Sequence, residues 1–209
     1  MAVSLYYPLS GQLSLNDFSG NNSNLINSNC VFINDGIKRN SYFNNNNGQY
    51  NYLYCNDIPL PSDKTLSFCI KTFATPTANS YFVYHGNLQR ASIRYVNSGF
   101  RLYFYGGEGF CNVPAQSINL LTRKWIHFVI KYNFTNKNIQ VYRDSILIYN
   151  YNTAENILHI TTAATMYILG TLGTSPYNTA MCEFLADSEL WSAAKIKTEY
   201  ARMKGLLNI

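Results

Sequence analysis

The sequence predicts an all-β fold in which two antiparallel sheets pack as a sandwich, with one short helix near the C-terminal end. Residues 122–151 hold three β-type runs, at 125–132, 139–142 and 146–149, separated by polar turn-forming residues. Along the first run one set of alternate side chains is wholly apolar or aromatic, and the other set is mixed. A three-stranded meander with one apolar face needs a second sheet over that face. Helical periodicity is confined to residues 192–207, which predicts a single helix after the strands.

The alternation assigns each side chain of the first run to a face. The expected core-facing set is Ile126, Phe128, Ile130 and Tyr132. The expected opposite set is Trp125, His127, Val129 and Lys131. This meander should therefore form the centre of the sandwich.

The remaining β-type runs are short and are bounded by Gly, Pro, Asn or Asp. We expect further strands at residues 3–9, 30–33, 50–54, 66–73, 81–85, 91–96, 100–105, 164–170 and 180–186. Hairpin turns are expected at residues 34–36 and 86–87, and a glycine-rich connection at residues 106–109. In the helix we expect Ser192 as the N-cap, and Ile196, Tyr200 and Met203 on one face. No internal boundary appears, so we expect one domain over residues 1–209.

The composition is rich in tyrosine and poor in charge. Among 209 residues, 15% are aromatic and 13% are charged, which is roughly half the usual charged share of about 25%. Tyrosine and asparagine suit contact surfaces, although an A+T-rich genome would produce the same bias. The net charge is +5, but the basic residues are scattered, so we expect no nucleic-acid partner.

The cysteines and the first residues bear on the compartment. The five cysteines have wide, unpatterned spacing and form no CxxC pair, which argues against a zinc site or a disulfide framework. The start lacks a basic region followed by a long apolar run, so it does not predict a secretion signal. No stretch reaches membrane-spanning length. We expect synthesis in a reducing cytoplasm, with free thiols and no membrane partner.

Several motifs occur in an order and spacing that are typical of one family. They are residues 5–9 followed by 16–22 (NDFSGNN), 65–72 (TLSFCIKT), 124–132 (KWIHFVIKY), 142–145 (YRDS), 167–170 (YILG) and 190–196 (LWSAAKI). Together they resemble the laminin-G-like branch of the concanavalin A-like lectin and glucanase jelly rolls. The resemblance implies a LamG-like jelly roll over nearly the whole chain. It marks scaffold and not function, because this sandwich hosts glucanases, lectins, adhesion modules and virion parts.

The family pattern is broken at one position that bears on calcium. Some members hold a structural calcium with an Asp before a Glu-hydrophobic pair, and Cys182 stands at that position here, before Glu183 and Phe184. A thiol is a poor ligand for a hard cation, and Asp17 alone would not make a site. We expect no metal and no cofactor.

No catalytic constellation is recognisable. A glycosidase needs two carboxyl groups flanking the scissile bond, and the Glu-x-Asp-x-(x)-Glu pattern of the related glucanases is absent. The nearest acidic cluster is Glu183, Asp187 and Glu189, which we expect to be solvated surface charges. His127 is expected to be a packed or interfacial imidazole. His85 and His159 have no recognisable Ser or Cys partner, so we expect no enzyme.

Two groups of residues are candidates for ligand binding. Sugars bind by stacking on aromatic faces and by hydrogen bonds to polar side chains. The first group is Arg101, Tyr103, Tyr105 and Glu108, and the second is Tyr81, His85 and Arg90. The alternative is that these tyrosines lie under a neighbouring chain or loop.

These observations favour a non-enzymatic binding or structural module that works on a larger assembly. We expect a phage virion surface protein (a capsid decoration protein, head fibre or tail adhesin) that is made in the host cytoplasm without a signal peptide. Its expected partners are other virion proteins or further copies of itself, with a cell-surface glycan as a potential ligand. One alternative is a purely architectural virion subunit without a ligand. The other is a divergent glycan-cleaving enzyme, in which alanine at Glu108 or Glu183 would abolish turnover.

Overall fold

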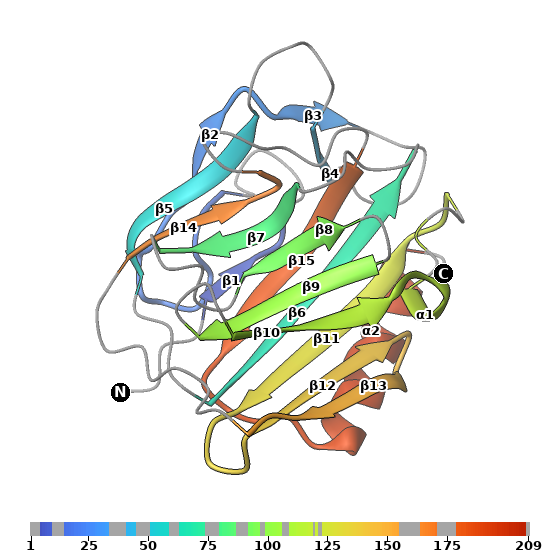
Figure 1. The fold of residues 1–209 in the computed structure, drawn as a ribbon. Coiled ribbons are helices and arrows are strands. Elements are labelled where there is room, and N and C mark those ends of the chain that lie inside the picture. Colours follow the sequence, from blue (N-terminus) through green and yellow to red (C-terminus); the bar gives the residue numbers. More distant parts are fainter. Residues whose placement is uncertain are drawn as a thin grey trace.

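The computed structural model describes most of the chain. The described residues are 5–9, 15–33, 41–44, 51–58, 63–73, 80–86, 92–96, 99–105, 109–118, 120, 123–154, 164–170 and 179–207. Two antiparallel sheets face each other as the layers of a sandwich, with the seven-stranded sheet in front in Figure 1. Within these residues no helix combines the length and the apolar character needed to cross a bilayer.

The larger sheet has eight strands in the described part of the chain. Its main path runs β13 (Ile146–Asn152), β12 (Asn138–Arg143), β11 (Ile126–Asn133), β6 (Lys64–Thr72), β15 (Thr179–Asp187), β4 (Ser41–Asn44) and β3 (Val31–Ile33). β1 (Leu5–Tyr7) pairs with β15 beside this path. β15 thus joins elements from both ends of the chain.

The second sheet has seven strands within the same described residues. Its order is β10 (Gly109–Pro114), β9 (Gly99–Tyr105), β8 (Ile93–Val96), β7 (Tyr81–His85), β14 (Ala164–Ile168), β5 (Tyr52–Ile58) and β2 (Ile26–Ser28). The strands β7 to β10 follow one another as hairpins, whereas β14 inserts between β7 and β5 from far along the chain. The all-β sandwich with a C-terminal helix is therefore confirmed.

The central meander lies as the alternation predicts. β11 pairs with β6 on one side and β12 on the other, with Phe128 opposite Phe68. The expected core-facing set of β11 is buried in the main core. Phe100 of β9 meets Phe128 with the ring centroids 5.2 Å apart, and this contact joins the two sheets. Burial of such rings supplies the main driving force for closing the layers.

Helix α2 (Ala193–Leu207) covers the outer face of the eight-stranded sheet, behind it in Figure 1. Ile196 and Trp191 form a small buried cluster with Val129 of β11, which is on the side of the sheet that faces away from the main core. Ser192 caps the helix, since its Oγ accepts the backbone N–H of Lys195 at 3.2 Å. The predicted N-cap is confirmed.

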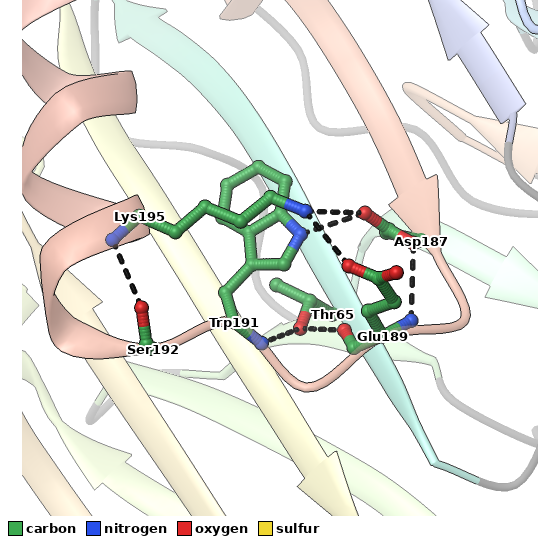
Figure 2. A network of polar contacts seen from close by, with 6 residues as sticks. All are labelled: Thr65, Asp187, Glu189, Trp191, Ser192 and Lys195. Atoms are coloured by element: carbon green, nitrogen blue, oxygen red, sulfur yellow. Dashed lines mark hydrogen bonds and ion pairs between the residues drawn. The ribbon is translucent and has the colours of Figure 1, made fainter.

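A polar network fastens the connection between β15 and α2 to the sheet (Figure 2). The hydroxyl of Thr65 on β6 donates to the carbonyl of Glu189 at 2.6 Å and accepts the backbone N–H of Trp191 at 3.1 Å. The carboxylate of Asp187 accepts the indole N–H of Trp191 at 2.8 Å and the ammonium of Lys195 at 3.0 Å. These bonds give the helix a defined orientation on the sheet.

Four elements of the structure are absent from the sequence-based prediction: β2, β4, β10 and α1. β2 is a three-residue strand beside β5, and α1 (Ala115–Ile118) is a single helical turn between β10 and β11. Segments this short carry no periodicity that a sequence can reveal. α1 contacts β9 and β10 of one sheet and β13 of the other, so it links the two sheets.

Candidate functional site

A row of aromatic side chains crosses the outer face of the seven-stranded sheet, which is the face turned away from the core. We call it the tyrosine band. It consists of Phe110 on β10, Tyr103 on β9, Tyr81 and Tyr84 on β7, Tyr167 on β14, and Tyr52 and Tyr54 on β5.

Over β10, β9 and β7 each ring of the band contacts the next. The ring centroids of Phe110 and Tyr103 are 5.8 Å apart, and those of Tyr103 and Tyr81 are 6.4 Å apart. Tyr81 and Tyr84 meet edge to face at 5.0 Å. Aromatic pairs at such distances attract one another, so each ring restrains its neighbour.

The band continues over β14 and β5. Tyr84 meets Tyr167 with the centroids 5.9 Å apart, and Tyr167 meets Tyr52 at 5.4 Å and Tyr54 at 6.2 Å. Tyr167 lies opposite Tyr84 in one strand pair and opposite Tyr54 in the other. The sheet register therefore places these rings in a row.

Local sequence explains why these side chains point outward. In β9 the core residues Phe100 and Leu102 alternate with Arg101 and Tyr103, as a strand requires. In β7 Tyr81 and Tyr84 are three residues apart, which simple alternation would place on opposite faces. A register shift between Tyr81 and the core residue Val83 brings both rings to the outer face.

Two arginines lie at the β9 end of the band. Arg94 of β8 and Arg101 of β9 are directly opposite each other in the strand pair. Arg94 donates from Nη1 to the hydroxyl of Tyr103 at 3.2 Å, and its guanidinium lies 5.3 Å from the ring centroid of Tyr81. Positive charge is thus stacked directly on the rings.

The hydroxyls of Tyr81, Tyr84 and Tyr167 are protonated at neutral pH. Burial is the largest cause raising the pKa of Tyr81, to about 12, against the opposing charge of Arg94. Burial also raises the pKa of Tyr84 and Tyr167, and neighbouring tyrosines add to the effect. A neutral phenol both donates and accepts hydrogen bonds, which suits a partner that is rich in hydroxyls.

The structure merges the two predicted ligand-binding groups. Arg101, Tyr103 and Tyr81, which the sequence assigned to separate groups, belong to one continuous face. For Tyr105 only the backbone, within β9, is described. Glu108, like Arg90, lies outside the described residues.

His85 does not belong to this face. Its side chain is 0% exposed, and its Nε2 lies 2.7 Å from the carbonyl oxygen of Ile58. The residue follows Tyr84 in β7 and therefore points to the interior. We correct the prediction and leave His85 out of the candidate site.

The sequence-based prediction missed more than half of the face. The missed residues are Arg94, Phe110, Tyr84, Tyr167, Tyr52 and Tyr54. Alternation within residues 93–96 and 109–114 was a signal for the first two. Nothing local indicates that residues 52–54 and 167 come together, because β5 and β14 are more than 100 residues apart.

The acidic cluster differs from its prediction at Glu183, whereas the side chain of Glu189 is 73% exposed, as expected. We expected Glu183 to be a solvated charge, and this was wrong: its side chain is 0% exposed. Its carboxylate accepts the hydroxyl of Tyr6 at 2.7 Å and Nη2 of Arg202 at 2.9 Å. Asp187 is held by Trp191 and Lys195 as described above. Both carboxylates are thus occupied by protein groups that join elements of the fold.

His127 is packed, as expected. It is 0% exposed beneath α2, its Nε2 lies 2.8 Å from the hydroxyl of Ser67, and its ring stacks on Tyr200 at 6.2 Å. Burial lowers its pKa to about 4. The Ser67–His127 pair has the spacing of part of a nucleophilic dyad, but α2 covers the pair and separates it from solvent.

Asp17, the one carboxylate that we considered as a calcium ligand, accepts hydrogen bonds from N–H and O–H groups of the protein instead. The carboxylate of Asp17 accepts the backbone N–H groups of Tyr6, Ser19 and Ser23, and the Ser19 hydroxyl at 2.8 Å. Among the described residues, no three His, Cys, Asp or Glu side chains gather in a way that could hold a metal ion.

Solved structures show where this fold recurs. Domain 4 of AbnA, a GH43 extracellular arabinanase from Geobacillus stearothermophilus, solved with arabinotriose, superposes with a TM-score of 0.74 at 13% identity, covering 94% of this chain and 98% of that one. The ligand-binding domain of botulinum neurotoxin serotype D, solved with N-acetylneuraminic acid, gives 0.72 at 16% identity, covering 96% and 50%. The binding domain of Paraclostridial Mosquitocidal Protein 1 gives 0.71 at 16% identity, covering 97% and 52%.

These similarities establish the fold, and this chain spans about half the length of the two toxin fragments. A comparison with curated proteins found no sequence match. Residues 45–197 match the model of the concanavalin A-like lectin/glucanases superfamily, which is most of the chain. Together with the two-layered sandwich, this match shows that the protein belongs to the concanavalin A-like lectin/glucanase superfamily.

Proposed function

We propose that this protein is a non-catalytic module that binds carbohydrate on the tyrosine band. The observation that carries the proposal is the unbroken chain of ring contacts from Phe110 to Tyr52 across one sheet face. The C–H faces of a sugar pack on such rings, while its hydroxyls meet phenol and guanidinium groups.

The band is ordered before any ligand arrives. Tyr81 and Tyr103 are only 6% and 3% exposed, so they support the neighbouring rings of the band and offer little surface of their own to a ligand. Tyr84, Tyr167, Tyr52 and Tyr54 remain partly exposed. Because neighbouring rings already restrain these side chains, binding would cost little additional side-chain entropy.

The similar structures are consistent with this reading. The arabinanase domain was solved with a trisaccharide, and the neurotoxin domain was solved with a sialic acid. At identities of 13% and 16% these ligands do not transfer to this chain, but they support carbohydrate as the first ligand class to test.

The occupied carboxylates support a binding module and not a glycan-cleaving enzyme. A glycosidase would need two carboxyl groups free to act on one bond. Glu183 is buried against Tyr6 and Arg202, on the opposite sheet from the tyrosine band. Turnover at Glu183 would first require breaking this contact.

The proposed setting is the surface of a phage virion, where the module would sit as a decoration protein, head fibre or tail adhesin beside other virion proteins or its own copies. The support is the composition: a tyrosine-rich chain with 13% charged residues suits protein contacts. Mass spectrometry of purified particles tests this setting independently of ligand binding.

The ligand proposal is tested by a glycan array followed by titration calorimetry, comparing the native chain with Tyr84→Ala and Tyr167→Ala. Each variant should weaken binding by about 5- to 30-fold, the loss of about 1–2 kcal/mol typical of a central aromatic contact. The matched control is Tyr142→Ala on β12, in the other sheet, which should bind normally.

The outcomes separate the candidate roles. Normal binding by both band variants would place the glycan elsewhere and refute the proposal. No binding to any glycan, together with self-association that Tyr84→Ala abolishes, would favour the architectural subunit, with the band as its contact surface. Hydrolysis of a bound oligosaccharide would show that the module is an enzyme.

A further inference from the structure

We propose that the band prefers an anionic saccharide, with the carboxylate or sulfate group of the sugar bound by Arg101. This inference deepens the proposed function and rests on it, because it names the chemical class of the ligand for the same face. It is carried by the way Arg101 is held and by the distribution of charge along the sheet.

Arg101 is fixed in place by neutral groups. Its Nε donates to Oδ1 of Asn112 at 3.1 Å, and its guanidinium carbon lies 4.2 Å from the ring centroid of Phe110. An amide and a ring neutralise no charge. Within the described residues, no carboxylate forms an ion pair with Arg101, and its two terminal nitrogens make no hydrogen bond.

This arrangement leaves the bidentate edge of the guanidinium available. The two terminal N–H groups of an arginine match the two oxygens of a carboxylate or of a sulfate ester. Because Nε and the flat face are already engaged, the side chain would lose little further freedom on binding.

The charge on the face is uneven. Arg94 and Arg101 lie side by side on β8 and β9, so the positive charge of this end is doubled. On the described strands of this sheet the carboxylate is Asp57 of β5, four strands from β9. At about 4.8 Å per strand that is about 19 Å, beyond the screening length of about 8 Å at physiological salt. Asp57 therefore does not offset the arginines.

The expected ligand follows from this geometry. Its neutral rings would lie along Tyr84 and Tyr167, and its acidic substituent would lie over Arg101. Uronic acids and sialic acids carry a carboxylate, and sulfated sugars carry a sulfate ester. A neutral oligosaccharide could use the rings but would leave the guanidinium edge with water alone.

The test measures binding to matched pairs of probes that differ only in the acidic group. The pairs are trigalacturonate and its methyl ester, 3′-sialyllactose and its methyl ester, and 3′-sulfolactose and lactose. The native protein should bind the acidic member of at least one pair about three- to tenfold more tightly. That preference should shrink when sodium chloride rises from about 0.05 M to about 0.5 M.

Variants identify the residue that is responsible. Arg101→Gln should abolish the preference and leave the affinity for the neutral member within about twofold, and Arg101→Lys should keep part of the preference. The matched control is Arg123→Gln, which removes one exposed positive charge from the connection before β11 and should leave the preference intact.

Three results overturn the inference in distinguishable ways. Equal binding of acidic and neutral members, lost in Tyr84→Ala, would refute the anionic preference while the proposed function stands. An acidic preference that survives Arg101→Gln would show that another group binds the anion. Binding to none of the six probes or to any array glycan would refute the proposed function as well.

Discussion

Replacing Arg202 tests the buried ion pair that joins α2 to the eight-stranded sheet. Arg202 bonds to the carboxylate of Glu183 on β15 at 2.9 Å, and to Glu199 on its own helix at 2.7 Å. Glu183 also accepts the hydroxyl of Tyr6 on β1. One carboxylate therefore connects three elements, two of which lie near opposite ends of the chain.

The structure bounds the size of the effect. Arg202→Ala leaves the fully buried Glu183 carboxylate without its cation, and such a change costs about 3–5 kcal/mol when both partners are buried. Arg202 is 38% exposed, so water can partly replace it, and the Tyr6 hydroxyl remains. We therefore expect a loss of about 2–3 kcal/mol in the free energy of unfolding, or about 4–12 °C in Tm for a chain of this size.

Urea unfolding followed by circular dichroism, with calorimetry for Tm, measures the loss. Lys197→Ala, at an exposed position of the same helix, is the control and should stay within about 0.5 kcal/mol of the native chain. Adding Glu183→Gln to Arg202→Ala should recover part of the stability, because an amide costs less to bury than an unpaired carboxylate. A double variant no more stable than Arg202→Ala alone would refute the reasoning.

Three further predictions concern buried and strained positions. Burial lowers the pKa of His127 to about 4, against about 6.5 in the unfolded chain. As the pH falls from about 6.5 to about 4, the unfolded chain therefore takes up the proton first, and the free energy of unfolding should decrease by up to about 3 kcal/mol. Urea titrations across that range should show a shallower pH slope in His127→Phe, and an equal slope would contradict the assignment. Gly99→Ala should lower the free energy of unfolding by at least about 3 kcal/mol, because φ is +132° and a Cβ would lie 1.9 Å from the carbonyl oxygen of Val113. Gly205→Ala in α2 places its Cβ in open space, and thermal melts should show a gain of about 0.5–1 kcal/mol in the free energy of unfolding. Burial lowers the pKa of Lys64 to about 7, so between pH 7 and about 10.5 the unfolded chain binds the Lys64 proton more strongly than the folded chain does. Lys64→Met should therefore raise the free energy of unfolding by about 1–3 kcal/mol near pH 7, and by less as the pH approaches 10.5. A variant that is less stable than the native chain at both pH values would contradict this prediction.

Patterns within short stretches of the sequence were sufficient to predict the strands of the central meander, the start of the helix and the fold class. The alternation in residues 126–132 correctly assigned both faces of β11, since side chains of a strand point alternately to its two sides. Ser192 was recognisable as an N-cap because its hydroxyl serves the backbone only a few residues away. The order of the family motifs predicted the jelly roll, which the family match confirms.

The candidate site depended on contacts that no local pattern encodes. Tyr54 and Tyr167 become neighbours only because β14 inserts beside β5, and the register shift in β7 turns Tyr84 outward. Glu183 read as a surface charge, because the helix that buries it begins ten residues later in the chain. Short-range rules of periodicity and capping thus suffice for the strands, the helix and the two-layered class. Which side chains share a face, and which charges are removed from water, follows from strand order and register, since these bring together residues more than 100 positions apart.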